Sequence, residues 1–197
     1  MKILFNGCSW TRGAELENIE EERFATLVCR ELAAECDMRG AGGTGNHRIT
    51  RTTLDALEES SYDLAVIQLS QPSRAEFYRD GQYDSVQWHV NLRERIGGRR
   101  KKDWDDDIKH FWYIYYKKIY HDQYGSDEEK MFLTAIRNTC LIKKVPLIMM
   151  TINGDTVHDF DMNLYKMNLP LHEGNHPTKK GHRMIASEIL KRYENIA

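Results

Sequence analysis

The sequence predicts an α/β protein with a mostly parallel central sheet that is covered by helices on both faces. Short apolar runs at residues 2–6, 63–69 and 144–151 have the composition of buried parallel strands. Between them lie segments whose apolar residues recur at helical spacing. A chain of 197 residues is by default one domain, so we expect a single three-layer α/β/α sandwich.

The expected elements alternate along the chain. After the strand at 2–6 come a helix over 20–35, a glycine-dense turn over 39–46, a helix from about 47 to 57 and the strand at 63–69. A helix over 127–143, the strand at 144–151 and a helix from 177 or 179 to 193 follow. Ser126 and Glu129 fit a capping box at the start of the helix over 127–143. Strand alternating with helix indicates parallel pairing.

Residues 74–125 do not fit the minimal pattern and are expected to form an insertion within the single domain 1–197. Residues 108–120 are helical by spacing and rich in aromatic side chains, which predicts core packing, with a lid over the site as the alternative. A basic run over 93–102 is followed at once by acids over 103–107. We expect a solvated loop there, and a clamp for an anionic substrate is the alternative.

Composition narrows the function classes. The chain has 28 Lys+Arg against 30 Asp+Glu, which argues against a general nucleic-acid or membrane binder. No run approaches the ~20 apolar residues of a membrane span, and the first apolar run is too short for a signal peptide. Four cysteines without a C-x-x-C pair predict reduced thiols in a cytoplasmic protein, with a bridge between Cys29 and Cys36 as the alternative.

The first strand leads into the segment Gly7-Cys8-Ser9-Trp10-Thr11-Arg12-Gly13. A tight turn there would present the Ser9 hydroxyl at the carboxyl edge of the sheet, where open α/β sheets place their ligands. Serine is a poor nucleophile by itself and needs a base with an orienting group. The segment Glu173-Gly174-Asn175-His176-Pro177-Thr178 offers both, in His176 and Glu173.

These two segments resemble the first and last sequence blocks of the SGNH, or GDSL, hydrolases. Residues 7–13 are similar to G-D-S-x-T-x-G, with Cys8 in the Asp position, and residues 173–177 are similar to D-x-x-H-P, with Glu173 in place of Asp. The resemblance implies a three-layer α/β/α sandwich of the flavodoxin-like SGNH hydrolase fold, and ester hydrolysis through a Ser9 acyl-enzyme without a cofactor. His176 would be the base and Glu173 the carboxylate that orients it.

The resemblance also implies an oxyanion hole. The backbone N–H of Ser9 is one expected donor, and that of Gly45 is a second, because residues 42–46 resemble the second block of the family. The third block normally carries an Asn donor, but Pro72 stands in that position here and has no N–H. Gln71 is the first candidate to replace it, and Asn46 is the second.

Several alternatives remain open at this point. Cys8 is considered as the nucleophile but is expected to be a buried small residue. A metal site among His158, Asp159, Asp161, His172, Glu173, His176 and His182 matches no ligand spacing, so none is predicted. The expected substrate is a small-molecule or carbohydrate ester with a small acyl group, such as O-acetyl. Acyl transfer, or a binding module with a weakened site, is the alternative function.

Overall fold

The computed structural model describes residues 1–79, 82–89, 95–98 and 104–196. Its main sheet has five strands in the order β2-β1-β3-β7-β8, and each neighbouring pair is parallel. The strands are β1 (Lys2–Asn6), β2 (Glu35–Met38), β3 (Leu64–Leu69), β7 (Leu147–Thr151) and β8 (Met162–Asn163). The α/β fold class that the sequence predicted is confirmed.

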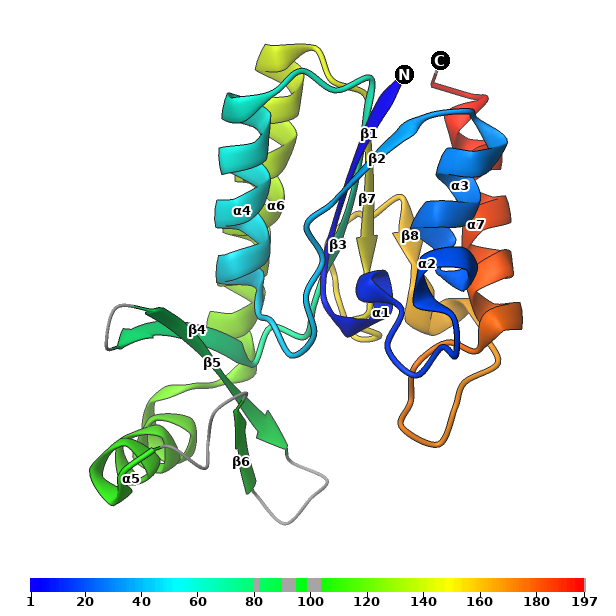
Figure 1. Cartoon of the computed structure of the whole chain (residues 1–197). Coiled ribbons are helices and arrows are strands. Elements are labelled where there is room, and N and C mark those ends of the chain that lie inside the picture. The colour runs from blue at the N-terminus through cyan, green and yellow to red at the C-terminus, as the bar shows by residue number, and fades with distance from the viewer. Residues whose placement is uncertain (80–81, 90–94, 99–103, 197) are drawn as a thin grey trace.

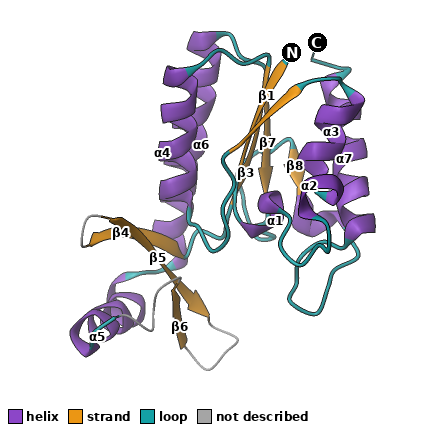
Figure 2. Ribbon diagram, in the orientation of Figure 1, coloured by secondary structure: helices purple, strands orange, loops and turns teal. Residues whose placement is uncertain are grey.

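Helices cover both faces of this sheet (Figures 1 and 2). On one face lie α4 (Asn46–Glu59) and α6 (Asp122–Lys143), and on the other lie α3 (Phe24–Glu31) and α7 (Lys179–Tyr193). Three short elements join them: α1 (Ser9–Arg12), α2 (Ile19–Glu22) and the 3-10 helix η4 (Leu164–Met167). The helix predicted over 127–143 is therefore part of a longer one.

Successive strand residues supply two separate cores. Ile3 and Phe5 of β1 pack with α3 and α7, whereas Leu4 packs with α4 and α6. In β3, Val66 packs with α3 and α7, and Ile67 packs with α4 and α6. Every residue of this strand is buried. A side-chain period of two explains the division, and burial on both faces explains why central parallel strands are apolar almost throughout.

Two local expectations were wrong. The helix predicted over 20–35 ends at Glu31, Ala33 has a left-handed backbone with φ of 47°, and Glu35 begins the edge strand β2. A left-handed residue cannot continue a right-handed helix. The capping box also fails, because α6 begins five residues before 127, with His121 as its N-cap. Ser126 and Glu129 lie inside the helix and contact the loop that follows β7.

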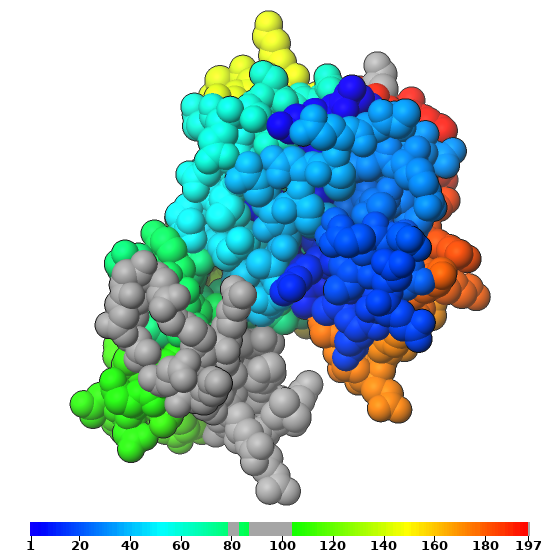
Figure 3. Space-filling model, in the orientation of Figure 1, coloured from blue at the N-terminus to red at the C-terminus, as the bar shows by residue number. Residues whose placement is uncertain are grey.

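Part of the segment expected as an insertion forms a second, antiparallel sheet. It consists of β4 (Arg74–Arg79), β5 (Gln82–His89) and β6 (Arg95–Gly98), followed by α5 (Asp106–Ile114) and the π-helix η3 (Tyr115–Ile119). Val86, Trp104, Trp112 and Tyr116 form its buried cluster, so the aromatic helix does serve as core. In the space-filling view the green surface of this segment projects from the body of the molecule (Figure 3). Most of the basic run over 93–102 lies outside the described residues.

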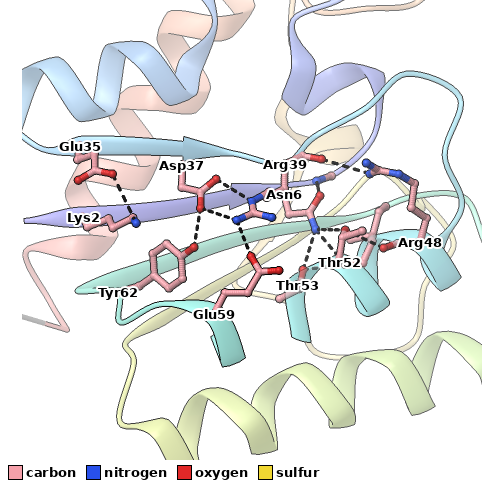
Figure 4. A network of polar contacts seen from close by, with 12 residues as sticks. Lys2, Asn6, Glu35, Asp37, Arg39, Arg48, Thr52, Thr53, Glu59 and Tyr62 are labelled. Atoms are coloured by element: carbon pink, nitrogen blue, oxygen red, sulfur yellow. Dashed lines mark hydrogen bonds and ion pairs between the residues drawn. The ribbon is translucent and has the colours of Figure 1, made fainter. Parts of the chain in front are cut away.

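Polar contacts tie β1 and β2 to α4 (Figure 4). Arg39 binds Asp37 and Glu59, and the Tyr62 hydroxyl donates to Asp37 at 2.5 Å. Burial and the neighbouring Asp37 carboxylate raise the pKa of Tyr62 to about 12, so this hydroxyl stays a donor at neutral pH. The side-chain amide of Asn6, near the end of β1, donates to the carbonyl of Ile49 in α4 at 3.0 Å. These contacts hold the end of β1, where the site begins.

Cys29 and Cys36 are neighbours but carry free thiols, as do Cys8 and Cys140. Within the described part of the chain, no helix is long and apolar enough to cross a membrane.

Candidate active site

Ser9 is the first residue of α1, at the carboxyl edge of the main sheet (Figure 1). Its backbone N–H is at a helix N-terminus and so has no partner within the helix. The residue is 8% exposed. Cys8 is fully buried beneath it, with its sulfur 3.9 Å from the Ser9 hydroxyl. The turn therefore presents the serine rather than the cysteine, as the sequence predicted.

Gln68 holds this turn in place, and the sequence had not singled it out. It is the one polar residue of β3 and is fully buried. Its Oε1 accepts hydrogen bonds from the Cys8 N–H at 3.2 Å and from the Thr11 hydroxyl at 2.9 Å. These bonds fix both ends of the segment that carries Ser9. A polar residue in the middle of an apolar strand is the signal that could have found it.

His176 comes from the far end of the chain and meets Ser9. Its Nε2 lies 2.9 Å from the Ser9 Oγ. His176 is held by a tight turn in which the His172 N–H donates to the His176 carbonyl at 2.8 Å. Thr178 then caps α7, with its hydroxyl accepting from the Gly181 N–H. The turn and the cap together set the direction of the imidazole.

The carboxylate beside the other ring nitrogen is that of Glu15. The Nδ1 of His176 lies 3.0 Å from the Glu15 Oε2, which is an ion-pair distance, although the pair is not aligned as a hydrogen bond. The Glu15 side chain is 37% exposed. A carboxylate only accepts, which favours the proton on Nδ1 and leaves the Nε2 lone pair facing Ser9.

This arrangement corrects the sequence prediction, which gave Glu173 that place. Glu173 is exposed at the tip of the turn 172–176, and among the described residues no hydrogen bond or ion pair joins it to His176. On a helical turn, the three-residue spacing would place Glu173 and His176 on the same face. Asn175, between them, has a left-handed backbone with φ of 63°, so the segment turns instead.

Glu15 occupies its place through an unusual backbone and a close contact. It has φ of 68°, a conformation that non-glycine residues adopt rarely and at a cost of about 1–3 kcal/mol. Its carboxylate lies against Gly174, where a Cβ would collide with Oε1. No sequence motif marks Glu15, which is one of five glutamates between residues 15 and 22.

The expected backbone donor Gly45 caps the N-terminus of α4. A Cβ at this position would collide with the carbonyl oxygen of Arg74, so the close approach of β4 requires glycine here. The described structure thus accounts for the glycine through a backbone contact. Its role as an oxyanion donor stays a prediction.

The two amides considered for the third donor are engaged elsewhere. Asn46 is 2% exposed; its Oδ1 accepts from the Ser70 N–H at 2.6 Å and its Nδ2 donates to the Ser70 carbonyl at 3.3 Å. Gln71 donates from Nε2 to the Ile152 carbonyl at 3.2 Å. Each side chain therefore links loops at the carboxyl edge of the sheet, and each nitrogen keeps a second N–H.

Among the described residues, no group of three or more His, Cys, Asp and Glu side chains is arranged to hold a metal ion. His182, which stood in the metal alternative, is fully buried in the core between α3 and α7. Its Nδ1 accepts from the Phe24 N–H at 3.2 Å, and its ring stacks on that of Phe24. His182 is therefore a core residue that packs against Phe24 and accepts its N–H.

Solved structures of other proteins share this fold. TesA superposes on the whole chain with a TM-score of 0.61 and 9% identity, and the match covers all of both chains. A putative lipolytic protein of the G-D-S-L family from Desulfitobacterium hafniense matches with a TM-score of 0.53 and 11% identity, over 96% of this chain and 98% of the other. A two-domain esterase active on acetylated mannans matches with a TM-score of 0.50 and 16% identity, over all of this chain and 49% of its own.

No protein-family model matches the chain, and a search of curated protein sequences found no match. The likeness to these proteins is therefore one of architecture. The parallel sheet, its flanking helices and the full-length superpositions agree. The chain has the fold of the SGNH (GDSL) hydrolases.

Proposed function

We propose that the protein is a serine ester hydrolase in which Ser9 forms the acyl-enzyme. The Ser9 Oγ attacks the acyl carbon while His176 takes its proton, and His176 then returns that proton to the leaving alcohol. Water, deprotonated by His176, releases the acid and restores the serine. Glu15 keeps the imidazole in the correct tautomer and stabilises the imidazolium.

The contact between Ser9 and His176 carries this proposal. The two residues are 167 positions apart, and their reactive atoms are 2.9 Å from one another. A carboxylate stands at the opposite ring nitrogen, which completes the relay that an activated serine requires. A capping serine beside an unrelated histidine would not need that third group.

The oxyanion hole in this proposal consists of the backbone N–H groups of Ser9 and Gly45. Asn46 and Gln71 contribute mainly to holding the loops, because the amide nitrogen of each already binds a backbone carbonyl. A missing third donor costs on the order of 3 kcal/mol in transition-state stabilisation. The second candidate function is a binding module on the same fold with a weakened site. Pro72 favours it, because Pro72 stands in the position of the third donor.

A fluorophosphonate probe distinguishes the two candidates. An activated serine reacts with it, so we expect a single adduct on Ser9, located by mass spectrometry of the digested protein. Ser9→Ala should lose both labelling and hydrolysis of p-nitrophenyl acetate, and Cys8→Ala should keep both. An unlabelled, correctly folded protein would support the binding module, whereas labelling on Cys8 would make the chemistry thiol-based.

A further inference from the structure

Two of the four cysteines lie side by side at the edge of the main sheet, away from the candidate active site. Cys29 is in α3 and Cys36 is in β2, and a reversal of the chain over residues 32–35 separates them. Within this reversal Ala33 has its left-handed backbone, and the Ala34 N–H donates to the Cys29 carbonyl at 2.8 Å. The reversal therefore brings the strand back against the helix that it follows.

The register of β2 turns the Cys36 side chain toward Cys29. Cys36 pairs with Ile3 of β1, and paired residues of neighbouring strands face the same side of a sheet. Ile3 packs in the core on the α3 and α7 side, and Cys29 belongs to that core. Cys36 packs against the same core, and the two thiols interact directly.

The four thiols differ in their access to solvent. Cys29 is 5% exposed, whereas Cys36 on the edge strand is partly exposed. A dissolved reagent therefore meets Cys36 first. Cys8 and Cys140 are 0% and 1% exposed, so neither is open to the same reagent.

The contact between the two thiols also makes Cys36 the more reactive one. Interaction with Cys29 lowers the pKa of Cys36 against the effect of its burial, and the charge of Arg23 lowers it further. Interaction with Cys36, together with burial, raises the pKa of Cys29. The proton therefore leaves Cys36 first. Thiolates are the nucleophiles in thiol chemistry, and an accessible thiolate beside a second cysteine is typical of redox-responsive pairs.

We propose that Cys29 and Cys36 form a disulfide by exchange with low-molecular-weight disulfides, of which oxidised glutathione is an example. The bond links α3 to the edge strand β2. The inference is independent of the proposed function, because neither Ser9 nor His176 takes part in the exchange.

The exchange proceeds in two steps. The Cys36 thiolate attacks one sulfur of the small disulfide, which forms a mixed disulfide on Cys36 and releases one small thiolate. The Cys29 thiol then loses its proton to the solvent and attacks the Cys36 sulfur, which releases the second small thiolate. Two protein thiols are thereby oxidised, and one small disulfide is reduced to two thiols.

The test is incubation of the folded, reduced protein with oxidised glutathione, followed by blocking of free thiols with N-ethylmaleimide and mass spectrometry. We expect the intact protein to lose the mass of two hydrogens and to take up the blocking reagent at neither Cys29 nor Cys36. Arg30 lies between the two cysteines, so trypsin separates them, and the bond should join peptides 24–30 and 31–39. Excess dithiothreitol should restore the starting mass.

Single alanine variants assign a step to each thiol. Cys29→Ala leaves Cys36 without a partner, so the reaction should stop at the mixed disulfide and add the mass of one glutathione. Cys36→Ala should stay unmodified over the time in which the wild type reacts, because Cys29 is buried. Cys140→Ala is the matched control, since it removes a buried cysteine of α6, and it should form the bond as the wild type does.

The inference would be overturned by an unchanged mass of the wild-type protein or by a bond that includes Cys8 or Cys140. A glutathione adduct on Cys29 in the Cys36→Ala protein, formed as fast as the wild-type bond, would contradict the assignment of Cys36 as the attacking thiol. None of these results depends on whether Ser9 is catalytic, so failure of the esterase proposal is recognised separately, by the absence of a fluorophosphonate label on Ser9.

Discussion

The carboxylate of Glu15 lies against the backbone of Gly174, two residues before the proposed base His176. The contact joins the segment that follows Ser9 to the turn that holds the histidine. A methyl group at position 174 would occupy the space that the carboxylate now fills. The orientation of His176 therefore depends on Gly174, a residue without a side chain that could take part in the reaction.

Gly174→Ala therefore tests the contact directly. The new methyl group should displace the flexible end of Glu15 and lower kcat/KM for p-nitrophenyl acetate by about tenfold or more, since the base loses its orienting partner. The unfolding midpoint should change little, because a partly exposed side chain can move aside. Full activity in a variant with normal stability would show that Glu15 does not orient the base.

Glu15→Gln and Glu173→Gln form a matched pair of variants. An amide cannot stabilise the imidazolium and can favour the wrong tautomer, so Glu15→Gln should lower kcat by about 10²- to 10⁴-fold. Glu173→Gln changes an exposed carboxylate at the turn tip and should stay within about twofold of the wild type. Steady-state kinetics on p-nitrophenyl acetate decide the matter, and the reverse pattern would restore Glu173 as the partner.

Asn46→Ala should act on stability. It removes both hydrogen bonds to the Ser70 backbone and leaves a buried N–H and a carbonyl unpaired, at a cost of about 3 kcal/mol. Gln71→Ala removes one partly buried bond and should cost about 1 kcal/mol. Urea unfolding and kcat should be measured together for both variants. A kcat loss of ~10²-fold at unchanged stability in either one would identify it as the third oxyanion donor.

Stability should fall in mild acid through His182. Burial, followed by the charge of His172, lowers the pKa of His182 from 6.5 to about 4. The folded state therefore resists protonation, so the stabilising effect is complete above pH 6.5 and is lost as the pH falls from 6.5 to 4. The loss is on the order of 3 kcal/mol.

His182→Asn keeps an acceptor for the Phe24 N–H and does not titrate. Urea unfolding of this variant and the wild type at pH 7.5 and pH 4.5 isolates the effect from that of other groups. We expect a smaller drop in unfolding free energy for the variant. Equal drops would mean that His182 is not the group that titrates.

Much of the architecture follows from local patterns in the sequence. The apolar runs at β1, β3 and β7 are buried on both faces. Strands buried in this way are apolar almost throughout, so their composition alone predicts them. The edge strands β2 and β8 were missed because they are short and only partly buried. The contact between Ser9 and His176 could be predicted because a nucleophilic serine needs a base and because the two segments resemble the first and last blocks of one family.

The tertiary structure alone decided which carboxylate faces His176. Glu173 is near in sequence, but the left-handed Asn175 turns the chain and leaves Glu173 in solvent. Glu15 reaches the imidazole from the other end of the chain, through a left-handed backbone of its own and the space that Gly174 leaves open. Sequence spacing reports side-chain proximity only within a regular element, whereas a contact between two loops depends on where the whole fold places them.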